Sequence, residues 1–157
     1  MPSFNVTRRL PYSAQQVYAV AADVSAYREF LPLVKRSIIR SRKPLPNGGE
    51  VFDAELLVAY KKLRIEESMM SQVTTDPGNL TVRAQSNEGA VKSLDAVWRI
   101  KGMPDGGSEI DFSVDYTLKS RSLQFLLSGM FDLVVRKIMT AFEERARKLY
   151  GPQSASS

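Results

Sequence analysis

Residues 109–118 read EIDFSVDYTL, and this stretch decides the fold class. Apolar and polar residues alternate along it, and the apolar row is Ile110, Phe112, Val114, Tyr116 and Leu118. Because successive side chains of a strand point to opposite faces, the alternation predicts a strand with one dry face and one wet face. A dry face has to be covered by another layer of secondary structure.

The covering layer is predicted directly after this strand, where the apolar period changes. Apolar residues now recur every three or four positions, at Leu123, Leu126, Leu127, Met130, Phe131, Val134, Ile138, Phe142, Ala146 and Leu149. This spacing is typical of an amphipathic helix, which Gly151 and Pro152 would end. A helix over residues 121–149 would be roughly 43 Å long at 1.5 Å per residue, enough to cross a whole small sheet.

Upstream of residue 109, turn signals divide the chain into short extended segments. The signals are Pro46-Asn47-Gly48-Gly49, Asp76-Pro77-Gly78-Asn79, Asn87-Glu88-Gly89 and Pro104-Asp105-Gly106-Gly107. They predict a meander of about six antiparallel strands, preceded by a first strand over residues 3–10. Two short helices are predicted between the first strand and the meander. Ser13 and Gln16 form a capping box for one of them, and Ser25 can cap the second, which ends before Pro32.

The predicted fold class is therefore α+β: a curved antiparallel sheet wrapped around one long C-terminal helix, with two short helices after the first strand. Residues 1–151 form one domain, and we expect the polar tail 152–157 to be disordered. A curved sheet and a straight helix tend to leave an elongated cavity between them. Such a cavity is favoured by residues near this contact that have flexible side chains or none, namely Met69, Met70, Met130, Met139 and Gly129. The alternative is a helix packed tightly onto the sheet, with no cavity.

The chain contains neither Cys nor His. This composition excludes disulfides, thiolate chemistry, imidazole bases and the usual zinc and haem ligands. No nucleophile elbow, Walker-type loop or dinucleotide-binding glycine motif occurs in the sequence. We therefore expect no catalytic residues, no metal and no cofactor, and a protein that is not an enzyme.

The net charge of +5 is concentrated near the start, since residues 1–43 hold eight Lys or Arg and two acidic residues. Large apolar side chains surround Pro32 within this region, and they are Tyr27, Phe30, Leu31, Leu33 and Val34. A basic strip follows directly, formed by Lys35, Arg36, Arg40, Arg42 and Lys43. Apolar groups beside cations favour contact with a membrane or another anionic surface. The alternatives are a solvated basic face, and Phe30 and Leu31 packed under the edge of the sheet.

Short motifs along the chain, from about Pro2 to Gly151, carry a family resemblance. They are Pro11-Tyr12-Ser13 with Val17-Tyr18, Asp23-Val24 with Tyr27, Phe30, Leu31 and Pro32, Glu67-Ser68 with Ser71-x-Val73, Leu94 with Trp98, Phe131, and Phe142-Glu143-x-Arg145-Ala146 with Leu149-Tyr150-Gly151. In this order and spacing they resemble the coenzyme Q-binding family of the START/polyketide cyclase-like superfamily, which includes the bacterial ribosome-association toxin. The sequence differs from the family pattern at two places. Relatives typically carry Gly-Pro-Phe where this chain has Gly89-Ala90-Val91, and they often carry a proline where it has Arg28.

The resemblance implies a START-like helix-grip fold with a hydrophobic tunnel. It implies that the protein binds ubiquinone (coenzyme Q) or a late isoprenoid quinone precursor and acts as a lipid carrier or chaperone, without enzymatic activity, in respiration or quinone biosynthesis. The ligand-binding candidates are Tyr27, Phe30, Leu31, Pro32, Leu63, Glu67, Trp98, Val114, Leu126, Met130 and Phe131. Among them Tyr27 to Pro32 would form the gate, and Glu67 is either a contact to the quinone head or a satisfied buried carboxylate.

Two other functions stay open. The toxin relatives and the basic N-terminal quarter favour a ribosome-binding regulator that blocks association of the ribosomal subunits. An aromatase or cyclase would need Glu67, with Tyr60 or Tyr116, as its acid and base, and no His or paired carboxylate supports that role.

The expected location is the cytoplasm, with peripheral contact to the inner membrane and no contact to DNA. No run of about 18 apolar residues could span a bilayer, and the start MPSFNVTRRL lacks the order of a signal peptide. With no transit peptide apparent, we expect a bacterial member of the family.

Overall fold

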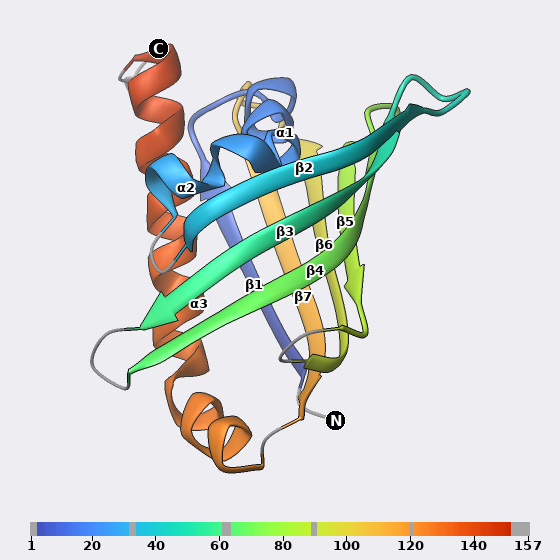
Figure 1. Cartoon of the computed structure of the whole chain (residues 1–157). Helices are drawn as coiled ribbons and strands as arrows, with labels where there is room; N and C mark the ends of the chain where they lie inside the picture. Colours follow the sequence, from blue (N-terminus) through green and yellow to red (C-terminus); the bar gives the residue numbers. More distant parts are fainter. Residues whose placement is uncertain (1–2, 32–33, 61–63, 89–90, 120, 152–157) are drawn as a thin grey trace.

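The computed structural model describes residues 3–31, 34–60, 64–88, 91–119 and 121–151. Seven antiparallel strands form one curved sheet in the order β1-β7-β6-β5-β4-β3-β2 (Figure 1). Their bounds are β1 Ser3–Leu10, β2 Val34–Pro44, β3 Glu50–Tyr60, β4 Ile65–Asp76, β5 Thr81–Ser86, β6 Val91–Gly102 and β7 Ser108–Leu118. Strands β2 to β7 each pair with their neighbour in the chain, which confirms the predicted meander. The first strand closes the other side of the sheet by pairing with the last, β7.

Residues 109–118 form nearly all of β7, and the predicted dry face is present. Ile110, Phe112, Val114 and Tyr116 are buried, and the residues between them are half-buried or exposed. The facing row of β6 continues this surface, because Ala96 pairs with Val114 in the antiparallel ladder. These rows form the floor of the core.

The helices are α1 Ala14–Ala22, the short 3₁₀ helix η1 Val24–Ala26, α2 Tyr27–Phe30 and α3 Arg121–Tyr150. The predicted capping box at the start of α1 is confirmed: the backbone N–H of Gln16 donates to Ser13 Oγ at 3.2 Å, and the N–H of Ser13 donates to Gln16 Oε1 at 3.1 Å. The predicted cap at Ser25 is wrong. Its hydroxyl donates to Asp23 Oδ1 at 2.9 Å, and α2 begins after Ala26 without a side-chain cap.

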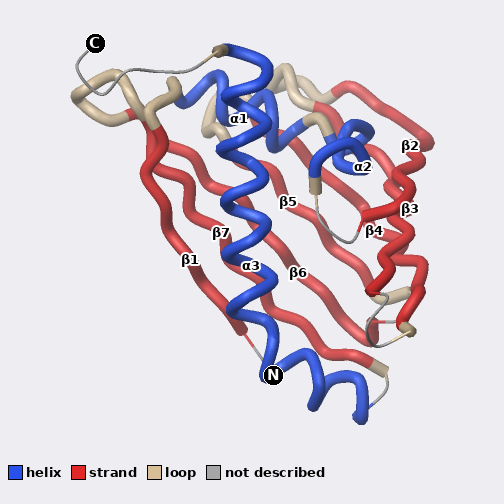
Figure 2. Tube along the Cα trace, turned by 90° about the vertical axis from the view of Figure 1, so that its left-hand side faces the viewer, coloured by secondary structure: helices blue, strands red, loops and turns tan. Residues whose placement is uncertain are grey.

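The long helix α3 lies across the concave face of the sheet (Figure 2). One side of it is buried against the sheet and α1, through Val135, Met139, Phe142 and Ala146. Residues four or seven apart fall on one face of a helix, so this spacing is the core-facing stripe that the apolar period predicted. The helix therefore encloses the interior between itself and the sheet.

The edge strand β2 departs from regular geometry at two places. Its register with β3 shifts between Val34 and Arg36 and again between Arg40 and Lys43. Ser41 lies inside the second shift with a φ of 58°. Such bulges bend an edge strand and change which face its side chains reach.

Candidate ligand-binding interior

The core between the sheet and α3 is built from apolar side chains. In the described part of the chain, the buried polar or charged residues are Thr75 and Ser108. Thr75 Oγ1 accepts a hydrogen bond from the backbone N–H of Glu50 at 2.9 Å, whereas Ser108 Oγ has no partner. An interior of this kind is suited to an apolar ligand, because burying a charged group without partners is costly.

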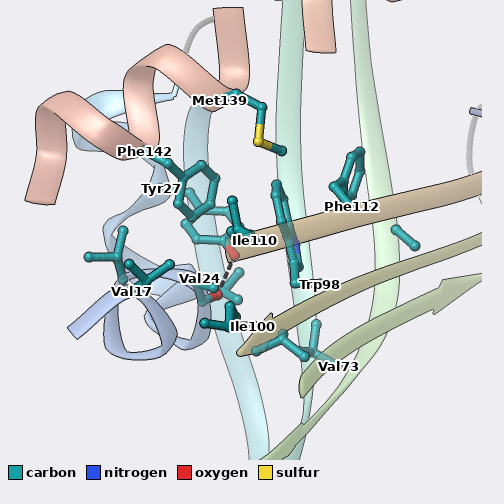
Figure 3. Close-up of a cluster of buried hydrophobic side chains, with 14 of the residues drawn as sticks. Val17, Val24, Tyr27, Val73, Trp98, Ile100, Ile110, Phe112, Met139 and Phe142 are labelled. Atoms are coloured by element: carbon teal, nitrogen blue, oxygen red, sulfur yellow. Dashed lines mark hydrogen bonds between the residues drawn. The ribbon is translucent and has the colours of Figure 1, made fainter. Parts of the chain in front are cut away.

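An aromatic cluster occupies the part of the interior next to α2. It consists of Tyr27, Phe30, Trp98, Phe112 and Phe142. Trp98 stacks on Phe112 with ring centroids 4.0 Å apart, and Phe142 lies 4.6 Å from Trp98. Phe142 also meets Tyr27 edge-on, with ring centroids 6.0 Å apart, and Figure 3 shows both rings beside Trp98. It meets Phe30 edge-on at 5.4 Å. Such pairs stabilise beyond the area they bury, by about 0.5–1.5 kcal/mol each.

The predicted gate is held against the rest of the fold at two points. Tyr27 is buried, and its hydroxyl donates a hydrogen bond to the carbonyl oxygen of Ala21 at the end of α1. Burial, and to a lesser degree the charge of Asp23, raises the pKa of Tyr27 above its usual range.

The second point is on α3. The guanidinium of Arg145 lies 5.2 Å from the ring centroid of Phe30 and 3.4 Å from the carboxylate of Glu29. The half-buried side chains of Phe30 and Leu31 pack against the core. The alternative reading, in which these two residues pack under the sheet, therefore agrees with the structure.

The structure brings together three of the predicted ligand-binding residues, Tyr27, Phe30 and Trp98, in the aromatic cluster. Val114 is buried on the same inner face of the sheet, opposite Ala96. Pro32 and Leu63 lie outside the described residues. Glu67 pairs with Val58 in the β3–β4 ladder, and Leu126, Met130 and Phe131 belong to α3, but their side chains are outside the described part. For all eleven predicted positions the ligand-binding role stays a prediction.

Two aromatic residues of the cluster, Phe112 and Phe142, were not among the predicted ligand-binding residues. Both belong to the periodic apolar rows of residues 109–118 and 121–149. The rows mark them as core residues, but the meeting of β6, β7, α2 and α3 arises only when those rows are placed in three dimensions.

A hollow of about 550 Å³ opens where the short strand β5 ends. Strand β4 pairs with β5 only from Gln72 to Asp76, so no described strand pairs with the preceding part of β4 on this side. There the hydroxyl of Ser86 donates a hydrogen bond to the carbonyl oxygen of Met70. Residues of the inward rows line the hollow, namely Ser71, Ser86 and Leu94, together with outward Asp53, Gln72 and Gln85. Residues of both faces of the sheet therefore line this hollow, which we call the notch.

The basic strip on β2 is largely compensated by carboxylates of the next two strands. Lys35 lies 3.8 Å from Glu66, and Arg40 lies 3.5 Å from Glu55. Arg42 pairs with Glu50, and its guanidinium lies 5.0 Å above the ring of Phe52. Arg36 and Lys43 are exposed. The basic strip has no acidic residues within it in the sequence, but in the folded sheet carboxylates of β3 and β4 lie beside its cations.

Two further features bear on the class of protein. Within the described ranges, no group of three or more His, Cys, Asp or Glu side chains is placed to hold a metal ion. No described helix is long and apolar enough to cross a membrane.

Comparison with known proteins gives a consistent assignment. Residues 10–143 match the family model described as polyketide cyclase/dehydrase and lipid transport. The chain is 35% identical over 93% of its length to the mitochondrial coenzyme Q-binding protein COQ10 of Drosophila melanogaster, of which it covers 59%.

A second relative is the ribosome association toxin RatA of Rickettsia prowazekii, which is 28% identical over 95% of this chain and is covered over 99% of its length. The solution structure of an 18 kDa protein from Caulobacter crescentus superposes with a TM-score of 0.80 at 26% identity, over 97% of this chain and 100% of that one. These matches extend over nearly the whole described domain.

Proposed function

The chain belongs to the START-like polyketide cyclase/dehydrase and lipid transport family, and from this premise we propose that it binds ubiquinone or a late isoprenoid quinone precursor as a non-catalytic carrier. The observation that carries the proposal is the apolar interior between the sheet and α3, which has no buried charge among the described residues. An isoprenoid tail is stabilised there by about 25 cal/mol for each Å² of apolar surface removed from water. The 35% identity to a coenzyme Q-binding protein supports the quinone as the ligand.

The quinone head requires only a few hydrogen bonds, which the notch at the end of β5 offers. Ser71, Gln72 and Gln85 line the notch and carry hydroxyl or amide donors that suit quinone oxygens. The predicted contact from Glu67 is an alternative for the same head group. In this proposal the quinone is cargo, and no catalytic residue, metal or cofactor takes part.

The test is to extract lipids from the purified protein and identify them by mass spectrometry. Ubiquinone is then titrated into lipid-free protein while the fluorescence of Trp98, the single tryptophan, is followed. We expect a copurified isoprenoid quinone and saturable quenching. Absence of both results would overturn the proposal.

A matched pair of variants on β6 tests whether the interior is the binding site. Ala96→Leu adds volume on the buried row opposite Val114, whereas Val97→Leu adds volume on the half-buried outer row. We expect Ala96→Leu to weaken ubiquinone binding at least several-fold and Val97→Leu to leave it unchanged. Equal affinities would place the ligand elsewhere.

A second candidate function is a ribosome-directed regulator, which the 28% identity to RatA over almost its full length favours. The test is cosedimentation of the protein with large ribosomal subunits at low salt. Binding that falls steeply with salt and decreases on substitution of Arg36 and Lys43 would support this function. Failure to cosediment removes it.

A further inference from the structure

The outward side of α3 carries exposed cations, whereas three of the five cations of the β2 strip lie in ion pairs. The exposed residues on this side are Leu133, Arg136, Lys137, Thr140, Arg147 and Lys148, and we call this surface the α3 face. Their spacing of three and four residues places them opposite the buried stripe that contains Met139 and Phe142. Among the residues of this side whose side chains the structure describes, Glu144 is the exposed acidic one. Within the described residues no ion pair involves Lys137, Arg147 or Lys148, in contrast to the paired cations of β2.

The α3 face also has an apolar component. Leu133 is 54% exposed, and it is one of two large apolar side chains exposed in the described part of the chain. A surface hollow of about 380 Å³ lies between residues of α2 and α3. Phe30 and Ala141 contribute apolar surface to this hollow, and Arg136, Lys137, Thr140 and the acidic Glu144 also line it. Cations around apolar groups are the arrangement that a lipid headgroup region accommodates.

The hollow is connected to the interior by direct ring contacts. Phe30 lines the hollow and meets Phe142 at 5.4 Å, and Phe142 meets Trp98 at 4.6 Å. A group that displaces Phe30 therefore changes the surroundings of Trp98 through one intervening ring. This places the α3 face next to α2, which is the described part of the gate predicted from Tyr27 to Pro32.

We propose that the α3 face is the surface by which this protein docks on an anionic phospholipid bilayer. Lys137, Arg147 and Lys148 supply the attraction to anionic headgroups. Leu133 enters the boundary between headgroups and acyl chains, and the hollow at Phe30 receives apolar lipid groups. An RNA backbone would use the cations but not the exposed leucine, so the observations favour lipid. The inference rests on the proposed carrier function, and it specifies where the carrier meets its membrane.

The test is flotation of the full chain with vesicles of phosphatidylcholine alone and of phosphatidylcholine with phosphatidylglycerol. We expect binding to the anionic vesicles only, with a change in Trp98 fluorescence. The double variant Lys137→Glu/Lys148→Glu should bind at least tenfold more weakly. Leu133→Ser should bind several-fold more weakly while keeping the same dependence on salt.

The matched control is Arg36→Glu/Lys43→Glu, which makes the same change of charge at exposed positions of β2. It should bind the anionic vesicles within about twofold of the unsubstituted protein, since β2 takes no part in the docking. Equal loss from both double variants would show that net charge alone is responsible. That result, or an unsubstituted protein that does not float, overturns the proposal.

A titration with ubiquinone in the absence of vesicles separates this proposal from the carrier function. Lys137→Glu/Lys148→Glu should retain quinone binding. Vesicle binding without quinone binding would overturn the carrier function alone, and the reverse result would overturn the α3 face alone. Cosedimentation with ribosomal subunits that depends on Lys137 and Lys148, without flotation, would identify the face as an RNA contact and overturn the lipid proposal.

Discussion

The ring of Phe142 on α3 lies 4.6 Å, centroid to centroid, from the indole of Trp98 on β6. The same ring also touches Tyr27 and Phe30. Phe142 thus joins the long helix to both the sheet and the segment after α1. Its removal should loosen three elements that are distant in the sequence.

Replacement of Phe142 by Ala is expected to lower the free energy of unfolding by about 3–5 kcal/mol, because it removes buried apolar surface and leaves a cavity. Urea denaturation followed by Trp98 fluorescence and by circular dichroism measures this change. Leu133→Ala on the same helix is the control, since Leu133 is 54% exposed and its loss should cost no more than about 0.5 kcal/mol. Similar costs at the two positions would contradict the packing described.

Replacement of Tyr27 by Phe removes the hydroxyl that donates to the carbonyl of Ala21. At neutral pH we expect a loss of about 1–3 kcal/mol in the free energy of unfolding, because a buried acceptor is left without its partner. The ring contacts to Phe30 and Phe142 are retained in this variant. A neutral effect in urea denaturation would mean that the hydrogen bond is not maintained in solution.

The same residue predicts a pH dependence. Burial raises the pKa of Tyr27, so above pH 10 the phenol of the unfolded chain ionises while the phenol of the folded chain stays protonated. The stability of the unsubstituted protein should therefore fall relative to Tyr27→Phe as pH rises above 10, by up to about 1.4 kcal/mol for each pH unit. A stability difference between the two proteins that is constant from pH 8 to pH 11 would refute this expectation.

Gly49, in the turn between β2 and β3, has no room for a side chain. A Cβ atom at this position would lie 1.9 Å from the carbonyl oxygen of Thr75 on β4. We expect Gly49→Ala to lower the free energy of unfolding by about 2 kcal/mol or more, because the backbone has to move. Gly102→Ala is the matched control: its nearest contact is the Cβ of Ala14 at 3.9 Å, so its effect should stay within about 1 kcal/mol.

Arg83 and Asp95 form a two-pronged ion pair on the outer face, with Nε to Oδ1 at 2.9 Å and Nη2 to Oδ2 at 2.7 Å. The hydrogen bond from Arg83 lowers the pKa of Asp95. The pair therefore stabilises the fold above the ordinary pKa of an aspartate, about 3.9, and this contribution is lost as pH falls below that value. Both side chains are partly solvated, so Asp95→Asn should cost only about 0.2–1 kcal/mol at pH 7.

Thermal unfolding of Asp95→Asn at pH 7 and at pH 3 checks this prediction. The difference from the unsubstituted protein should shrink at pH 3 and in high salt. Asp115→Asn provides a comparison at an exposed position on β7. A cost at Asp95 that does not depend on pH would point to packing rather than to charge.

Local patterns in the sequence predicted the elements well, because their causes are local. The capping box of Ser13 and Gln16 depends on residues three apart, and the dry row of β7 depends on simple alternation. The cap assigned to Ser25 failed for a local reason as well: its hydroxyl donates to Asp23 instead. A serine that has two nearby partners cannot be assigned from spacing alone.

The candidate site was harder to predict, because its causes are not local. The cations from Lys35 to Lys43 read as an isolated basic strip until β3 and β4 place Glu50, Glu55 and Glu66 beside them. Phe142 is one of many apolar residues in its helical period, and only tertiary packing selects it as the partner of Trp98. Periodicity identifies a face, whereas pairing across the fold decides what that face meets.

The pairing of β1 with β7 has a consequence for the way the chain is made. Ser3 lies opposite Asp115, so the first strand finds its partner only after the last strand has left the ribosome. During synthesis β1 has no strand to pair with, and the sheet closes in a late step. That step has a large entropic cost, because β1 and β7 are far apart in the sequence. Until then the open edge of β7 can pair with another chain, and the N-terminal strand is what protects a newly made molecule from aggregation.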